Sequence, residues 1–187
     1  MRKLFLPVAV GMLLGWAAPA AAAPVPIRDC GSRGEGPRPV TRLARPGDLK
    51  IGPVAFAGLA RVANRRAFDR FRSNGRFLMK APLFVRARRV VTVTITPLGS
   101  ATAGLTFDND APVDTGVPTV KFFACDEDQR AFSYDGVVGP VTVFPGGFTL
   151  SEPQCAVLRV RVRGRRLVYR RLVSFGMGPA RRDCDKL

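Results

Sequence analysis

The sequence contains no histidine. That absence excludes a Ser-His-Asp or Cys-His catalytic apparatus, and it excludes zinc or copper sites built from histidine ligands. Glutamate is scarce, and its three positions, Glu35, Glu127 and Glu152, lie in no context typical of a glycosidase pair. We therefore predict a protein that is not an enzyme and needs no cofactor. An unconventional carboxylate hydrolase is the remaining enzymatic alternative.

Polar aromatic residues are also few. The only tryptophan is Trp16, and the only tyrosines are Tyr134 and Tyr169. Carbohydrate-binding modules commonly use an exposed aromatic platform, and single-stranded nucleic acids stack on aromatic side chains placed among basic ones. The sequence therefore disfavours a sugar-binding module, and we expect no nucleic acid as a partner.

The sequence has 14 acidic residues and 30 basic ones, and several of the acidic residues lie in two predicted loops. Loops of this kind can hold Ca²⁺ through several oxygens. Neither loop has the ligand spacing, central glycine and closing glutamate of an EF-hand, so we predict solvated turns and no metal site. The only calcium candidates are Asp108 and Asp110 in the first loop and Asp126 and Asp128 in the second.

Long apolar runs are missing after the N-terminal segment. Residues 1–23 combine the basic pair Arg2 and Lys3, an apolar stretch over 4–16, and small residues over 17–23. This is the pattern of a secretory signal peptide, and a retained anchor helix is the alternative. We expect a secreted, extracellular protein, associated with the cell envelope or free, with no transmembrane span in the mature chain.

Four cysteines in an exported chain predict two disulfides. Three pairings of Cys30, Cys125, Cys155 and Cys184 are possible. We expect Cys125–Cys155, because each of these residues stands at the end of a predicted strand. That leaves Cys30–Cys184, which would tie the two ends of the chain together.

Short apolar runs alternate with turn residues through most of the chain. Residues 24–48 are rich in proline, glycine and arginine and predict an irregular arm, whereas 49–187 predict a single domain. Within it we expect about eight strands and an antiparallel β-sandwich, immunoglobulin-like or jelly-roll-like, with a barrel as the alternative. The main predicted strands cover 49–59, 77–85, 89–96, 103–107, 119–125, 141–144, 148–150 and the two arms of 155–175.

The segment 155–175 predicts a β-hairpin around which the other strands pack. In its first arm apolar residues alternate with arginines, so Arg159, Arg161 and Arg163 share one face. Arg165 and Arg166 fall at the tip, and Arg170-Arg171 interrupts the alternation, which predicts a bulge. Guanidinium rows can bind phosphate or carboxylate groups, so the candidate anion-binding residues are Arg159, Arg161, Arg163, Arg165, Arg166, Arg170 and Arg171. A second basic cluster is Arg86, Arg88 and Arg89.

Several motifs resemble a group of small, uncharacterised secreted proteins from high-GC Gram-positive bacteria. They are VKFFACD, GPVTVFPGGFTLSEPQC, VRVRG and SFGMG followed by a terminal cysteine, within residues 49–184. The resemblance implies a disulfide-stapled β-sandwich and brings no activity.

The formal net charge of +16 has two interpretations. Arginine-rich composition with abundant alanine, glycine and proline is typical of a GC-rich genome, and it is also what selection for an acidic partner would produce. We favour a non-catalytic protein that binds an anionic envelope polymer, lipid headgroups or an acidic protein through its arginine-rich strand. The alternative is a structural or protein-interaction domain at the cell surface whose charge is incidental.

Overall fold

The computed structural model describes residues 24–107, 114–178 and 184. The predicted signal peptide, residues 1–23, and the calcium candidates Asp108 and Asp110 lie outside the described residues. The described chain has an all-β fold, with thirteen strands in three sheets rather than the roughly eight strands expected from the sequence. None of these three sheets closes into a barrel. No helix in the described ranges is long and apolar enough to cross a membrane.

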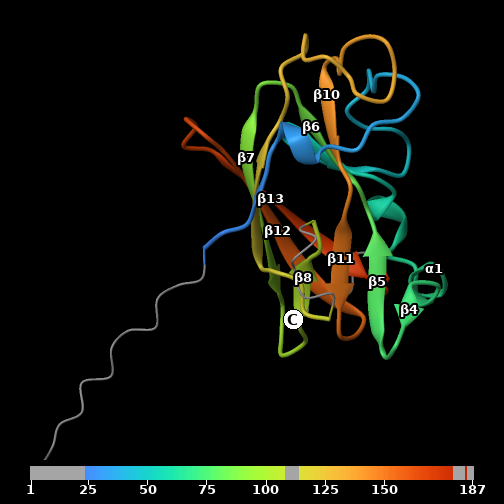
Figure 1. Cartoon of the computed structure of the whole chain (residues 1–187). Coiled ribbons are helices and arrows are strands. Elements are labelled where there is room, and N and C mark those ends of the chain that lie inside the picture. Colours follow the sequence, from blue (N-terminus) through green and yellow to red (C-terminus); the bar gives the residue numbers. More distant parts are fainter. Residues whose placement is uncertain (1–23, 108–113, 179–183, 185–187) are drawn as a thin grey trace, which may run out of the picture.

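The largest sheet has five strands in the order β1-β9-β7-β12-β13 (Figure 1). Its strands are β1 (Ile27–Arg28), β7 (Val90–Pro97), β9 (Thr119–Phe123), β12 (Gln154–Val162) and β13 (Val168–Phe175). The pairs are antiparallel except β1 with β9, which run parallel. Its central strand is therefore β7, with β9 and β12 on either side and β1 and β13 at the two edges.

The predicted hairpin is confirmed as β12 and β13, and its tip projects from the body of the molecule (Figure 1). Gly164 turns the tip with φ of 76°. The bulge predicted at Arg170-Arg171 is wrong, because the register runs without a break from Gln154 opposite Phe175 to Arg161 opposite Val168. The doubled arginine instead sends one side chain to each face of a regular strand.

Two four-stranded sheets make up the rest. Their orders are β10-β6-β3-β2 and β4-β5-β11-β8. The first contains β2 (Leu49–Ile51), β3 (Val54–Phe56), β6 (Leu83–Arg86) and β10 (Val141–Phe144). The second contains β4 (Arg72–Ser73), β5 (Arg76–Lys80), β8 (Ala103–Leu105) and β11 (Gly147–Leu150).

Short breaks divide what the sequence predicts as single strands. The predicted strand 49–59 is a hairpin, because Gly52 (φ 58°) and Pro53 turn the chain between β2 and β3. The predicted strand 77–85 breaks at Ala81-Pro82 into β5 and β6. Each break contains a proline, Pro53 or Pro82, and proline lacks the N–H that a central ladder needs.

One phenylalanine-rich core joins the three sheets. Phe122 of β9 lies 5.1 Å from Phe144 of β10, and Phe175 of β13 lies 5.6 Å from Phe148 of β11, measured between ring centroids. The Phe148 ring is also 5.4 Å from that of Phe56 in β3. All five rings are fully buried. Every sheet therefore has its inner side chains in a common apolar interior.

Helical structure in the described part of the chain is confined to short turns. They are η1 (Cys30–Ser32), η2 (Leu59–Arg61) and α1 (Arg65–Asp69). The Asn64 side chain caps α1 by accepting from the amide of Ala67. Phe68 of α1 is fully buried and stacks on Phe77, with 4.4 Å between ring centroids.

Two disulfides are present, as the cysteine count predicts, but the expected pairing is wrong. The bonds are Cys30–Cys125 and Cys155–Cys184. Strands β9 and β12 each run antiparallel to β7, which lies between them, so they are parallel to each other. Cys125 follows the end of β9 and Cys155 lies near the start of β12, which places the two cysteines at opposite ends of the sheet. The N-terminal arm is thus attached to β9 and not to the C-terminus.

Candidate anion-binding sites

The outer face of the five-stranded sheet carries a basic surface, which we call the Arg face. Alternation along β12 buries Ala156, Leu158, Val160 and Val162 and leaves Arg159 and Arg161 exposed. The cross-strand register adds further residues of neighbouring strands to the same side. The Arg face consists of Arg159, Arg161, Arg170 and Lys121, together with Thr92, Thr94 and Thr119.

The register of these residues sets their spacing. Arg159 lies directly opposite Arg170 on β13 and Thr94 on β7. Adjacent strands are about 4.8 Å apart, and alternate residues of one strand are about 7 Å apart. The cationic side chains therefore start from a lattice with steps of about 5–7 Å, and the hydroxyls beside them are neutral hydrogen-bonding groups.

Nothing described on the Arg face offsets its charge. The face includes no acidic residue, and Arg159, Arg161 and Arg170 make no ion pair with any described residue. Like charges directly opposite each other in a sheet are destabilising, so the Arg159 and Arg170 pair costs folding free energy. Such an arrangement suits the binding of an external anion.

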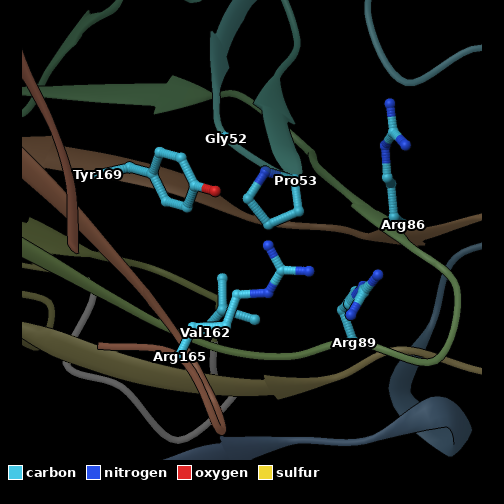
Figure 2. Close-up of a pocket in the computed structure, with 7 residues that line it drawn as sticks. All are labelled: Gly52, Pro53, Arg86, Arg89, Val162, Arg165 and Tyr169. Atoms are coloured by element: carbon cyan, nitrogen blue, oxygen red, sulfur yellow. The ribbon is translucent and has the colours of Figure 1, made fainter. Parts of the chain in front are cut away.

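A second basic site lies between the hairpin tip, the turn that joins β2 to β3, and the segment that joins β6 to β7, and we call it the tip pocket. It is a cavity of about 200 Å³ lined by Gly52, Pro53, Arg86, Arg89, Val162, Arg165 and Tyr169 (Figure 2). Figure 2 shows the Arg165 guanidinium between the Tyr169 ring and Arg89, with Arg86 beyond Pro53. The three arginines come from the tip, the end of β6 and the residue before β7.

A glycine allows the aromatic wall of the tip pocket to lie where it does. A Cβ on Gly52 would be 2.7 Å from ring atoms of Tyr169, and the φ of Gly52 is 58°. Tyr169 is half-buried and packs against the core. The ring therefore rests directly on the backbone of the turn between β2 and β3.

Arg86 and Arg89 also line a second, larger cavity of about 350 Å³, which therefore adjoins the tip pocket at these two side chains. The remaining lining of this second cavity includes Thr41, Leu43, Ala87, Glu127, Pro140 and Val141. Arg86 and Arg89 thus line both cavities. The tip pocket is rich in arginine, whereas the rest of the second cavity is mostly neutral and has one carboxylate, that of Glu127.

The predicted anion-binding residues separate into different environments. Arg165 joins Arg86 and Arg89 in the tip pocket, which brings together two clusters that are 76 positions apart (165 − 89) in the sequence. Arg163 continues the exposed strand beyond Arg161, and Arg166 is exposed at the tip. Arg171 lies opposite the inward-facing Leu158, so it is on the other side of the sheet from the Arg face.

Acidic residues of the second loop form ion pairs with Arg88. The Arg88 guanidinium lies 3.5 Å from Asp126 and 3.9 Å from Asp128. Within the described ranges no group of three or more Asp, Glu, His or Cys side chains could hold a metal. The calcium candidates Asp126 and Asp128 therefore pair with Arg88. Arg88 is the one arginine of the second basic cluster that does not line the tip pocket.

Glu35 forms a buried polar cluster that the sequence did not reveal. Its side chain is 4% exposed and pairs with Arg33, which is 7% exposed. Glu35 accepts from the amides of Phe132 (2.7 Å) and Ser133 (2.9 Å), and the Arg33 guanidinium lies 4.6 Å over the Phe132 ring. Burial works to raise the pKa of Glu35, but the hydrogen bonds from Ser133, Arg33 and Phe132 together hold that pKa below its usual value. The charged carboxylate is therefore a structural group.

No family model, curated protein or solved structure matches this chain.

The sequence did not predict Lys121 as part of the Arg face, or Tyr169 and Gly52 as part of the tip pocket. These residues meet their neighbours only through the pairing of strands that are distant in the sequence. Alternation in 119–125 places Lys121 on the outward side of its strand, but only the order of the strands puts it beside Thr92. Tyr169 and Gly52 are 117 positions apart (169 − 52) and no local pattern connects them.

Proposed function

We propose that this chain is an exported, non-catalytic protein that binds an anionic polymer of the cell envelope through the Arg face. One observation carries the proposal. Arg159 and Arg170 stand directly opposite each other on an exposed sheet face, with no described acidic group to offset their charge. A polymer with regularly spaced anionic groups would relieve this repulsion, and guanidinium groups bind phosphate and carboxylate oxygens in pairs.

The fold and the compartment belong to the same proposal. We propose that the three sheets form a two-layer sandwich, supported by the single core that joins them. Export is supported by the two disulfides and by the pattern of residues 1–23. The resemblance to small secreted proteins of high-GC Gram-positive bacteria remains a prediction.

The proposal is tested by retention of the folded protein on immobilised polyphosphate at increasing salt concentration. The test variant is R159Q/R161Q/R170Q, and the control is R42Q/R66Q/R70Q, whose arginines are exposed outside the Arg face. Both variants lose the same charge. We expect the face variant to elute at clearly lower salt than the control, and equal elution of the two variants would contradict the proposal. Poly-L-glutamate and vesicles containing phosphatidylglycerol then show which anion is preferred.

A second candidate function is that of a structural or protein-interaction domain. The observation that favours it is the position of β13 at the edge of the five-stranded sheet, where Arg170 and Arg171 are exposed. Charged residues on an edge strand prevent pairing with other chains. If R170Q/R171Q self-associates while polyphosphate retention is unchanged, this second function is the better account.

A further inference from the structure

The tip pocket gathers positive charge that nearby acids leave unneutralised. Arg86, Arg89 and Arg165 form no ion pair with any described residue, whereas the neighbouring Arg88 is paired with Asp126 and Asp128. No residue that lines the tip pocket is acidic. Three guanidinium groups around about 200 Å³ repel one another, and a bound anion would remove that cost.

The donors of the tip pocket fit a group with several anionic oxygens. Each guanidinium offers a planar fork of N–H donors, and the three forks come from three separate segments. The Tyr169 hydroxyl, which has no described hydrogen-bond partner, adds a neutral donor (Figure 2). A carboxylate has two oxygens and one negative charge, whereas a phosphate monoester has three terminal oxygens and a charge near −2 at neutral pH. The number and charge of the donors favour the phosphate monoester.

The adjoining cavity indicates what the phosphate is attached to. Beyond Arg86 and Arg89 its lining is mostly neutral, with the Thr41 hydroxyl and the Glu127 carboxylate as polar groups. Glu127 would repel a second anionic group but accept hydrogen bonds from hydroxyls. The ligand should therefore carry its charge at one end only.

From these observations we propose that the tip pocket binds the phosphate monoester end of a polyhydroxylated molecule, such as a phosphorylated sugar, whose uncharged body occupies the adjoining cavity. The tip pocket shares no residue with the Arg face, so this proposal stands or falls independently of polymer binding.

The test uses calorimetric titration of the full mature protein with glucose 1-phosphate, with inorganic phosphate, glucose and dimethyl phosphate as further probes at constant ionic strength. We expect saturable binding of glucose 1-phosphate, weaker binding of inorganic phosphate, and none of glucose or dimethyl phosphate up to about 10 mM. Absence of saturable glucose 1-phosphate binding in that range would overturn the proposal. Equal binding of phosphate and glucose 1-phosphate would overturn the part that concerns the adjoining cavity.

Neighbouring arginines provide matched controls for this titration. R89Q and R165Q should each weaken glucose 1-phosphate binding by about tenfold or more, because each removes charge-assisted hydrogen bonds. R88Q and R163Q carry the same change next to these positions but outside the tip pocket, and they should bind as the wild type does. Equal weakening in all four variants would mean that net charge alone attracts the ligand and would overturn the proposal.

The pH dependence tests which ionised form of the phosphate monoester is bound. The groups facing the phosphate are Arg86, Arg89, Arg165 and Tyr169, with Glu127 in the adjoining cavity, and the chain has no histidine. A phosphate monoester gains its second charge near pH 6, so between about pH 5 and 7 it changes from a monoanion to a dianion. Affinity for glucose 1-phosphate should therefore rise with pH across this interval. A flat profile would contradict recognition of the dianion.

Discussion

At the residue scale, the Glu35 carboxylate connects two separate parts of the chain. It lies in the N-terminal arm, yet it accepts hydrogen bonds from Phe132 and Ser133 in the loop that follows Cys125. Arg33 makes the same connection from its own side by donating to the carbonyl of Arg130. A buried ion pair of this kind is costly to break from one side, because the remaining charge stays buried without its partner.

The substitution Glu35→Gln should lower the free energy of unfolding by roughly 3 kcal/mol, since it leaves the Arg33 guanidinium buried without its counter-charge. Urea unfolding at neutral pH measures this change. Glu152→Gln is the control, because Glu152 is exposed and its side chain makes no described hydrogen bond. If both variants unfold at the same urea concentration, Glu35 does not have the structural role described above.

The lowered pKa of Glu35 also predicts a dependence of stability on pH. The unfolded carboxyl takes up its proton near pH 4.5, at a higher pH than the folded one. Stability contributed by Glu35 is therefore fully present above about pH 4.5 and is lost as pH falls through the lower folded pKa. Thermal unfolding between pH 3 and 7 should show this loss in the wild type and a smaller loss in E35Q, and identical slopes would contradict it.

At the element scale, local patterns predict strands well and their partners poorly. Alternation in 155–162 and 89–96 gives the buried faces of β12 and β7, because side chains of a strand point alternately to the two sides of a sheet. The order β9-β7-β12 depends on contacts between distant segments, so the disulfide pairing inferred from strand ends was wrong. The bulge predicted from Arg170-Arg171 failed for a related reason, because an edge strand tolerates a charge on its inner side.

Close strand contact at Gly147 gives a prediction for the β11 and β5 pair. A Cβ on Gly147 would lie 1.8 Å from the carbonyl oxygen of Met79, so no side chain fits without separating the strands. Gly147→Ala should lower the free energy of unfolding by at least about 3 kcal/mol or prevent folding. Gly36→Ala is the control, since a Cβ there meets nothing within 4 Å. Similar melting temperatures for the two variants would contradict the close approach.

At the scale of the whole molecule, the two disulfides attach the N-terminal arm and Cys184 to the five-stranded sheet. The Cys30–Cys125 bond closes a loop with a sequence separation of 95, and Cys155–Cys184 closes one of 29. The chain-entropy relation assigns about 4.7 and about 3.6 kcal/mol to loops of these lengths. The longer loop includes β2 to β9, so its closure restricts most of the unfolded chain.

Removing the disulfide that closes the longer loop should therefore lower the free energy of unfolding more than removing the other disulfide. We expect the double variant C30A/C125A to lose up to about 4.7 kcal/mol of unfolding free energy and C155A/C184A up to about 3.6 kcal/mol, in urea titrations. Peptide mapping without reduction should recover Cys30 linked to Cys125. A Cys125–Cys155 peptide from the native protein would contradict the strand order itself.

The distribution of charge over the whole molecule decides between a binding function and a composition effect. The Arg face and the tip pocket collect arginines that form no ion pair with any described residue, whereas Arg88, Arg33 and Arg65 are paired with Asp or Glu. A composition effect alone would give no preference for one surface in binding.

The most direct test of the central claim is the salt dependence of polyphosphate affinity for the wild type, the face variant R159Q/R161Q/R170Q and the equally charged control R42Q/R66Q/R70Q. The logarithm of affinity falls linearly with the logarithm of salt concentration, with a slope that counts ionic contacts. Binding through the Arg face predicts that the slope of the face variant decreases in magnitude by about 2–3 and that the control keeps the wild-type slope. Equal slopes and affinities for the two variants would contradict the claim that this surface binds the polymer.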